Sequence, residues 1–405
     1  MESMQDIVEM GQKYVMNTYA RFPYAFTRGE GVYLYDMDGK KYLDFVSGIA
    51  VNSLGYGNEA LIGNLEEQMH KVFHTSNLYW IEPQVKLAKA LVERSCFDKA
   101  FFCNSGAEAT ESALKLARKY GNLVGGEEKC EIITMKNSFH GRTYGSITAT
   151  GQTKYQKGLG PMLPGIRYAE FNNIDSVRAI ASKEHTCGVL VEPVQGEGGV
   201  IPADPGFMKE LRELCSQLDI LMMVDEVQTG IGRTGKLFGY QNYGIEPDVM
   251  ALAKGLGGGV PIGAMLAKDF CAKAFQPGDH ASTFGGNFLS ATAGLTVLSE
   301  IDRLDLTENA RIQGEYLQEA AKKLQSRYDF ITEVRGLGLM QGIILKDAQL
   351  VGQIRLEAAK RGLLVIGAGY TALRIVPPLI IQREEIEEGL RILDEAMAEV
   401  TKKNE

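Results

Sequence analysis

The chain of 405 residues lacks the features typical of secreted, membrane-spanning and nucleic-acid-binding proteins. Its six cysteines are scattered without a CxxC pair, and most lie in apolar runs typical of buried, reduced thiols. No apolar run approaches the length of about 20 residues that crosses a membrane, and the acidic N-terminus does not resemble a signal peptide. Because the net charge is −8 and no basic run interrupts the chain, we expect no nucleic-acid partner. The cysteine pattern, the N-terminus and the lack of a membrane-length run predict a cytoplasmic location without membrane contact.

What the chain does contain is a lysine at the end of an apolar run. Residues 249–253 carry no charge and lead through Lys254 into glycines, which predicts a buried strand that opens into a loop. Ligands of open α/β folds bind at this carboxyl edge of the sheet. Burial can release a lysine amine for covalent reaction with a carbonyl group. Taken alone, however, Lys254 is better explained as a side chain that reaches from a strand end to solvent.

A second uncharged run, residues 220–224, ends at Asp225. If the two runs form parallel strands, an acid and an amine lie on the same edge of the sheet. Pyridoxal phosphate requires such a pair: a lysine that binds its aldehyde and an aspartate that keeps its pyridine nitrogen protonated. The two runs together therefore indicate a site for this cofactor, with Lys254 and Asp225 as catalytic residues.

The motifs around these residues carry a family resemblance. VDEVQTG at residues 224–230, followed by ALAKGLGGG at residues 251–259, resembles the class III pyridoxal phosphate-dependent aminotransferases. The likeness extends over nearly the whole chain, and TYARFP at residues 18–23 is similar to acetylornithine aminotransferases in particular. The resemblance implies an α/β fold-type I transferase, with a mostly parallel central sheet flanked by helices in a large domain and a smaller α+β C-terminal domain.

The pattern of elements predicts three parts of the chain. Residues 1–42 are expected to form an N-terminal arm, a helix and a β-hairpin, that joins the small domain. Residues 43–304 are expected to form the large cofactor-binding domain. Residues 305–405 are expected to form the small domain, with one strand over residues 363–366.

Ser105, Gly106 and Ala107 lie between a predicted strand and a predicted helix that we expect to end at Gly121. The N-terminus of a helix favours an anion by roughly 0.3 to 1 kcal/mol per charge. A plain helix cap is the commoner explanation of such a motif alone. Beside the lysine and aspartate motifs, phosphate binding explains it better, and the resemblance implies that these three residues hold the cofactor phosphate.

The resemblance also implies roles for other cofactor-binding residues. Phe139 and Val227 are expected to lie on the two faces of the cofactor ring, and Gln228 is expected to contact the cofactor. Thr283 is expected to reach across a homodimer interface to the partner's phosphate, so that each active site needs both subunits. Ser282 beside it is expected to contact substrate.

Three charged residues are the further candidates for substrate binding. Arg142 follows a glycine in a loop and suits a bidentate carboxylate contact. Glu197 is flanked by glycines and is either a solvated loop acid or a site acid, which the resemblance favours. Arg374, ahead of a Pro-Pro pair, is either an exposed strand-end arginine or the carboxylate-binding arginine that the resemblance implies.

Other motifs are rejected on their context. His70 and His74 lack a third ligand nearby, so we predict no metal site. His140 is expected to be structural. The GxGxxG pattern at residues 230–235 is separated from the preceding strand by residues 225–229 and is not followed by a helix pattern. The overlapping phosphate loop GxxxxGK has Leu237 where Ser or Thr is required, so both motifs argue against a nucleotide-binding enzyme.

The predicted activity is transfer of the terminal amino group of N-acetylornithine to 2-oxoglutarate, which gives N-acetylglutamate semialdehyde and glutamate and serves arginine biosynthesis. Ornithine, succinylornithine, succinyldiaminopimelate and 4-aminobutyrate are alternative amino donors, because such enzymes share their catalytic residues and differ in pocket shape.

Overall fold

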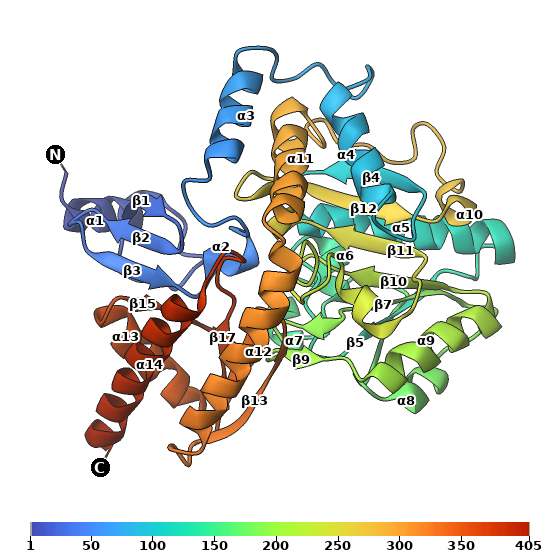
Figure 1. The fold of residues 1–405 in the computed structure, drawn as a ribbon. Helices are drawn as coiled ribbons and strands as arrows, with labels where there is room; N and C mark the ends of the chain where they lie inside the picture. Colours follow the sequence, from blue (N-terminus) through green and yellow to red (C-terminus); the bar gives the residue numbers. More distant parts are fainter. Residues whose placement is uncertain (1, 405) are drawn as a thin grey trace.

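The structure, a computed structural model, describes residues 2–404 and is built around a seven-stranded sheet in the order β4-β12-β11-β10-β7-β5-β6 (Figure 1). All pairs from β11 to β6 are parallel, and β12 is antiparallel to both of its neighbours. The predicted mostly parallel sheet is therefore confirmed. Its strands are β4 (Lys99–Cys103), β5 (Glu131–Met135), β6 (Ile166–Ala169), β7 (Thr186–Val191), β10 (Leu221–Asp225), β11 (Val249–Leu252) and β12 (Gly263–Ala267).

The central strands are uncharged over most of their length because helices cover both faces of the sheet. Alternate side chains of a strand point to opposite faces. In β10, Leu221 and Met223 pack with α5 (Gly106–Gly125), whereas Met222 and Val224 pack with α9 (Pro205–Leu218). Every residue of β7, β10, β11 and β12 is buried. Burial on both faces explains why these strands read as continuous apolar runs.

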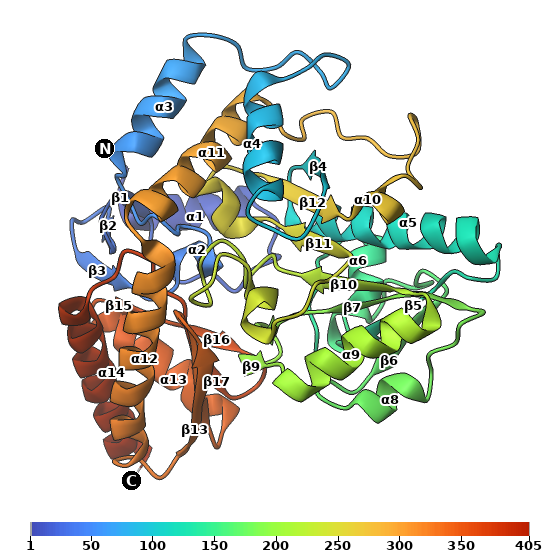
Figure 2. The ribbon, with the colours of Figure 1, turned by 45° about the vertical axis from the view of Figure 1, so that its right-hand side comes forward.

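Further helices and two short strands complete this part of the molecule. They are α2 (Ser47–Ala50), α3 (Glu59–Met69), α4 (Glu82–Val92), α6 (Tyr144–Ala149), α7 (Thr153–Gln156), α8 (Ile174–Arg178), α10 (Asp269–Ala272), α11 (Phe288–Arg303), the 3₁₀ helices η1 (Gly239–Tyr243) and η2 (Lys254–Gly257), and the short strands β8 (Val194–Gln195) and β9 (Ile201–Pro202). The long helix α11 contacts α3 and α4, as Figure 2 shows.

The C-terminal part has its own four-stranded antiparallel sheet in the order β13-β14-β17-β16. Its strands are β13 (Ile331–Leu337), β14 (Met340–Leu345), β16 (Ile366–Ala368) and β17 (Ala372–Ile375), and its helices are α12 (Leu306–Gln325), α13 (Ala348–Lys360) and α14 (Arg383–Asn404). The predicted α+β character of this part is confirmed, while the domain boundaries stay predictions.

The N-terminal segment forms a third sheet with a strand from far along the chain. After α1 (Met4–Tyr14), the strands β1 (Phe26–Glu30), β2 (Tyr33–Asp36) and β3 (Lys41–Asp44) pair in sequence order, and β15 (Leu363–Leu364) adds to β3 in parallel. Figures 1 and 2 both place these N-terminal strands beside the C-terminal helices.

Two sequence expectations were wrong. The strand expected over residues 363–366 is divided between two sheets, because β15 pairs with β3 and β16 pairs with β17. The helix α5 ends at Gly125 rather than at Gly121. Gly121 is buried, and a Cβ there would lie 2.2 Å from the carbonyl oxygen of Lys129, so the glycine permits close packing and does not end the helix.

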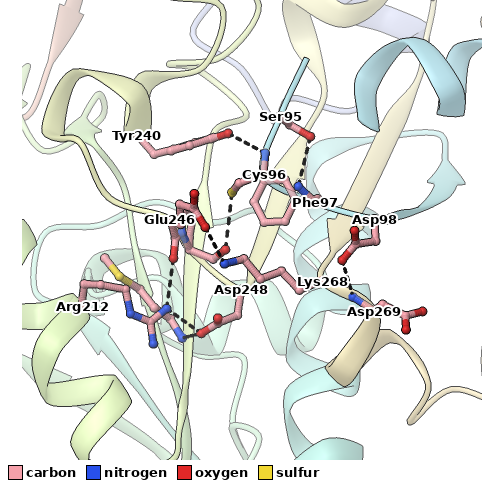
Figure 3. Close-up of polar contacts among 12 residues, drawn as sticks. Ser95, Cys96, Phe97, Asp98, Arg212, Tyr240, Glu246, Asp248, Lys268 and Asp269 are labelled. Atoms are coloured by element: carbon pink, nitrogen blue, oxygen red, sulfur yellow. Dashed lines mark hydrogen bonds and ion pairs between the residues drawn. The ribbon is translucent and has the colours of Figure 1, made fainter. Parts of the chain in front are cut away.

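At the amino-terminal edge of the central sheet, a polar cluster around Asp248 joins several elements (Figure 3). One carboxylate oxygen, Oδ2, accepts from Arg212 Nη1 at 2.7 Å and from the Met222 backbone at 2.8 Å. The backbone N–H of Lys268 donates to the Asp248 carbonyl oxygen at 3.0 Å. These contacts therefore link α9 and β10 to the residue before β11 and the residue after β12.

None of the helices in the described part of the chain combines the length and the apolar character that crossing a membrane requires.

Candidate active site

The ends of three neighbouring strands bring an amine and two carboxylates to one cavity of about 310 Å³. Asp225 is the last residue of β10 and lies opposite Ala251 of the parallel strand β11, which Lys254 follows. Glu192 follows β7, the strand on the other side of β10. All three residues line the cavity at the carboxyl edge of the sheet. The sequence prediction that Lys254 and Asp225 share this edge is therefore confirmed in geometry.

Lys254 is held in an unusual environment. Its φ of +41° lies in the left-handed region, which costs a residue with a side chain free energy and is concentrated at functional sites. Burial lowers the pKa of its ammonium, and the charge of Arg374 lowers it further, against the opposing effects of Glu197, Asp225 and Glu192. A lowered pKa raises the fraction of the neutral amine, which is the nucleophilic form, at a given pH.

Asp225 is 4% exposed and is fixed by two donors. Its Oδ1 accepts from the backbone N–H of Val227 at 3.0 Å, and its Oδ2 lies 2.7 Å from Nδ1 of His140. The His140 side chain is fully buried, and its Nε2 has no partner among residues 2–404. Sequence reasoning treated His140 as structural and so missed this contact. The only signal was its place in the loop that also carries Phe139.

Glu192 was also missed, although it follows an uncharged run just as Asp225 does. Its Oε2 accepts from the backbone N–H of Phe139 at 3.1 Å, and the residue is 5% exposed. Burial, and then the neighbouring charge of Asp225, raise the pKa of Glu192 well above its usual value. Burial in this cavity therefore disfavours the ionised form of Glu192.

The N-terminus of α5 forms another wall of the cavity. Ser105 is its N-cap and accepts from the Glu108 backbone at 3.2 Å, and Gly106 and Ala107 begin the first turn. A Cβ on Gly106 would lie 2.7 Å from a methyl carbon of Val227, so only glycine lets the helix begin this close to that side chain. The free backbone N–H groups and the dipole of this 20-residue helix suit a phosphate group.

The residues of the cavity fit pyridoxal phosphate as a set. They combine an amine with a lowered pKa, a nearly buried carboxylate and the N-terminus of a long helix. Phe139, Val227 and Gln228 line the same cavity. The positions predicted for the cofactor, except Thr283, are therefore brought together.

Arg374 and Glu197 form an ion pair beside the cavity, in which the arginine is buried and the glutamate side chain is 23% exposed. Arg374 is 1% exposed, and its Nη1 donates to Glu197 Oε1 at 2.5 Å and to Gln228 Oε1 at 3.0 Å. Burial raises the pKa of Glu197, but the charges of Arg374 and Lys254 outweigh it and the pKa lies below the usual value. Arg374 is therefore not the solvent-exposed strand-end residue that the sequence left open, and Glu197 is not a solvated loop acid.

Ser282 and Thr283 lie elsewhere. Both line a separate cavity of about 830 Å³ together with Asn77 and Trp80, and Thr283 does not line the cavity of Lys254. A hydrogen bond of 3.1 Å from Asn104 Nδ2 to Ser282 Oγ joins the walls of the two cavities. Beside this second cavity, Leu78 is 87% exposed and Trp80 is 91% exposed.

A lysine and an aspartate at the carboxyl ends of adjacent parallel strands, in one cavity with the N-terminus of a long helix, define a pyridoxal phosphate-dependent enzyme of fold type I. Comparison with known families matches residues 14–397 to the family described as aminotransferase class-III. The chain belongs to this family, whose members depend on pyridoxal phosphate.

Individual relatives agree with this assignment. The acetylornithine aminotransferase of Caldanaerobacter subterraneus subsp. tengcongensis is 50% identical over 391 residues, which cover 96% of this chain and 98% of that protein. The structure of ornithine aminotransferase from Toxoplasma gondii ME49 superposes with a TM-score of 0.95 at 28% identity and covers 100% of this chain and 97% of its own. N-acetylornithine aminotransferase from Stenotrophomonas maltophilia K279a has a TM-score of 0.84 at 37% identity, with 97% of this chain and 99% of that chain covered.

Proposed function

We propose that the protein transfers the terminal amino group of N-acetylornithine to 2-oxoglutarate, giving N-acetylglutamate semialdehyde and glutamate, and so serves arginine biosynthesis. The similarity to acetylornithine aminotransferases over nearly the whole chain supports this donor. The single structural observation that carries the proposal is the ion pair between Arg374 and Glu197 beside Lys254. Such a pair lets one site accept two substrates that carry their carboxylates in different places.

The two substrates make different demands on the site. The donor reacts through its terminal amine, so no carboxylate lies next to its reacting carbon. Glutamate reacts through its α-amine, and a carboxylate must then be held close to the cofactor. In our proposal Arg142 binds the distal carboxylate of both substrates. Glu197 neutralises Arg374 while the donor is bound, and releases it to bind the α-carboxylate of glutamate.

Pyridoxal phosphate, when bound, supplies the aldehyde that takes up the amino group and an electron sink for the substrate carbon. In our proposal Lys254 binds the cofactor covalently through Nζ and then moves the proton between substrate and cofactor. Asp225 holds the ring nitrogen in its protonated form. Ser105, Gly106 and Ala107 would hold the phosphate. Phe139 and Val227 would pack against the ring, and Gln228 would also contact the cofactor.

A homodimer with shared active sites is also part of the proposal. The exposed side chains of Leu78 and Trp80, beside the cavity that holds Ser282 and Thr283, support a second copy of the chain as the partner. Thr283 would then contact the partner's cofactor phosphate and Ser282 the partner's substrate. We also propose domain boundaries after residues 42 and 304 and a cytoplasmic location. Both proposals rest on the sequence alone.

The test is a panel of amino donors with 2-oxoglutarate as acceptor. We expect N-acetylornithine to have the highest kcat/KM. Ornithine, succinylornithine, succinyldiaminopimelate and 4-aminobutyrate are the comparison donors. A clear preference for any of these would replace the proposed donor while leaving the aminotransferase activity in place.

A further inference from the structure

Arg142 differs from Arg374 in what its guanidinium contacts. Arg374 is nearly buried and donates to Glu197 and Gln228. Arg142 is exposed and makes no hydrogen bond or ion pair with any residue between 2 and 404. Its guanidinium carbon instead lies 4.1 Å from the ring centroid of Tyr155 and 5.3 Å from that of Phe139. All N–H donors of Arg142 are therefore free for a ligand, while aromatic rings hold the group in place.

The ring that holds Arg142 is itself firmly placed. Tyr155 is half-buried in α7 and meets Phe139 edge-on, with ring centroids 5.7 Å apart and an angle of 81° between the rings. Its backbone N–H donates to the carbonyl oxygen of Gln152 at 3.1 Å. The side chain of Gln152 donates in turn to the carbonyl oxygen of Ser138 at 3.0 Å. Tyr155 is thus tied to the loop that carries both Phe139 and Arg142.

The backbone around Arg142 does not fix its side chain. A Cβ on Gly141 would lie 2.7 Å from the Cβ of Ala107, so this loop packs closely on the first turn of α5. Glu111 of α5 accepts from Thr143 Oγ1 at 2.5 Å and from the Gly145 backbone at 2.8 Å. These contacts fix the backbone at Arg142 but leave the rotamer of its long, exposed side chain undetermined. Among residues 2–404, the contacts that restrict this rotamer are those with the rings of Tyr155 and Phe139.

We propose that Tyr155 is a positioning residue that orients Arg142 and thereby sets the affinity of the enzyme for substrate carboxylates. The inference rests on the proposed function, in which Arg142 binds the distal carboxylate. A guanidinium binds a carboxylate bidentately through its N–H edge, and its face is free to lie against an aromatic ring. The contact with Tyr155 lets the arginine adopt its binding orientation before substrate arrives, so less side-chain entropy is lost on binding.

The first part of the test compares Tyr155→Leu with Tyr155→Phe in the cofactor-loaded enzyme. Tyr155→Leu should raise KM for both N-acetylornithine and 2-oxoglutarate by roughly three- to tenfold, since a cation–π contact at a partly exposed site is of that strength. Its kcat and the visible absorbance of the bound cofactor should stay within about twofold of wild type, because the chemistry near Lys254 is untouched. Tyr155→Phe keeps the ring and should restore KM.

Tyr120→Leu is the matched control. Tyr120 is also half-buried and also meets a phenylalanine edge-on, Phe270, at 5.5 Å, but no cation from residues 2–404 lies over its ring. This variant should leave KM unchanged. An equal rise of KM in Tyr120→Leu and Tyr155→Leu would indicate a general loss of packing and would overturn the proposal.

The second part is a double-mutant cycle between Arg142→Ala and Tyr155→Leu. If Tyr155 acts through Arg142, Tyr155→Leu should raise KM in the wild-type background and have no further effect once Arg142 is absent. The same rise in both backgrounds, or none in either, would overturn the role of Tyr155 while leaving that of Arg142 intact. An unchanged KM in Arg142→Ala alone would instead refute the proposed carboxylate contact, and the role of Tyr155 with it.

Discussion

At the scale of single residues, Lys254 combines a left-handed backbone with an amine whose pKa is lowered. Lys254→Ala should abolish covalent attachment of the cofactor and proton transfer together. We expect turnover to fall by a factor of about 10⁴ or more, with loss of the visible absorbance of the attached cofactor. The measurement is steady-state turnover together with a spectrum of the purified protein. Sustained multiple turnover by the variant would contradict the assignment.

A single substitution also tests the role of Asp225. Asp225→Asn keeps the shape of the side chain and its contact with His140 but removes the charge that is proposed to face the ring nitrogen. Leaving one member of a buried ion pair unmatched costs about 3 to 5 kcal/mol, so the half-reaction should slow by a factor of about 10² or more with cofactor saturating. Stopped-flow measurement of single half-reactions tests this. A change in cofactor affinity alone would show that the role is wrong.

Glu197 is the residue that tests the choice between substrates. Glu197→Ala leaves Arg374 without its carboxylate partner, so the site should favour glutamate over the ω-amine donor. The ratio of kcat/KM for the two half-reactions should shift toward glutamate by about tenfold or more, as expected when a nearly buried charge loses its partner. Glu333→Ala is a control, because that carboxylate pairs with Arg335 and is 51% exposed. Equal losses on both sides for Glu197→Ala would rule out the proposed alternation.

At the scale of elements, the cluster around Asp248 joins β10 to the start of β11, the two strands that lead to Asp225 and Lys254. Asp248→Asn should lower the free energy of unfolding by about 2 to 3 kcal/mol, because Arg212, only 19% exposed, loses its partner. Asp302→Asn is the control, because the ion pair that it removes, with Arg94, is exposed. The free energy of unfolding of this variant should change by less than about 1 kcal/mol. Denaturant titration of both variants measures the difference. Equal effects would contradict the role of the cluster.

Glu226 links the end of β10 to η1 and should make stability depend on pH. Its carboxylate accepts from Gly239 at 2.8 Å and Tyr240 at 2.6 Å, yet burial raises the pKa of Glu226 to about 7. Between the unfolded value near 4.3 and this folded value, the folded state binds the extra proton, so the contribution to stability is full at low pH and is lost as pH rises to about 7. Relative to Glu226→Gln, the wild type should lose up to about 1.4 kcal/mol per pH unit in that window. Urea titrations of both proteins from pH 5 to pH 8 measure it, and parallel curves would contradict the prediction.

Whether a feature of the fold or the site could be predicted from the sequence depended on how far apart along the chain its interacting residues lie. Apolar runs that end in a charged residue marked β10 and β11, because burial on both faces leaves a local pattern in the sequence. The contact between His140 and Asp225 spans 85 residues and leaves no such pattern. The division between β15 and β16 depends on which partner strand each finds, and a single apolar run does not carry that information. The Thr283 assignment depends on a second subunit, and no pattern within one chain carries that information.

At the scale of the whole molecule, shared active sites predict complementation between two inactive variants. In a heterodimer of Lys254→Ala and Thr283→Ala subunits, one site would contain an intact Lys254 from one chain and an intact Thr283 from the other. Mixing the two variants, with subunit exchange, should therefore restore activity toward about one quarter of the wild-type value at equal amounts, since random pairing makes half of the dimers mixed and each mixed dimer has one complete site. No recovery, despite exchange seen by native mass spectrometry, would place Thr283 at the site of its own chain.

The pairing of β3 with β15 has a consequence for how the protein is made. Leu43 pairs with Leu363, so 363 − 43 = 320 residues separate the two partners. At about 5–20 residues per second, the free edge of β3 waits roughly 15 to 65 s on the ribosome for its neighbour. An unpaired strand edge can recruit other chains in that time. Slow translation or premature termination before residue 363 should therefore favour aggregation, even though the completed protein leaves no such edge at β3.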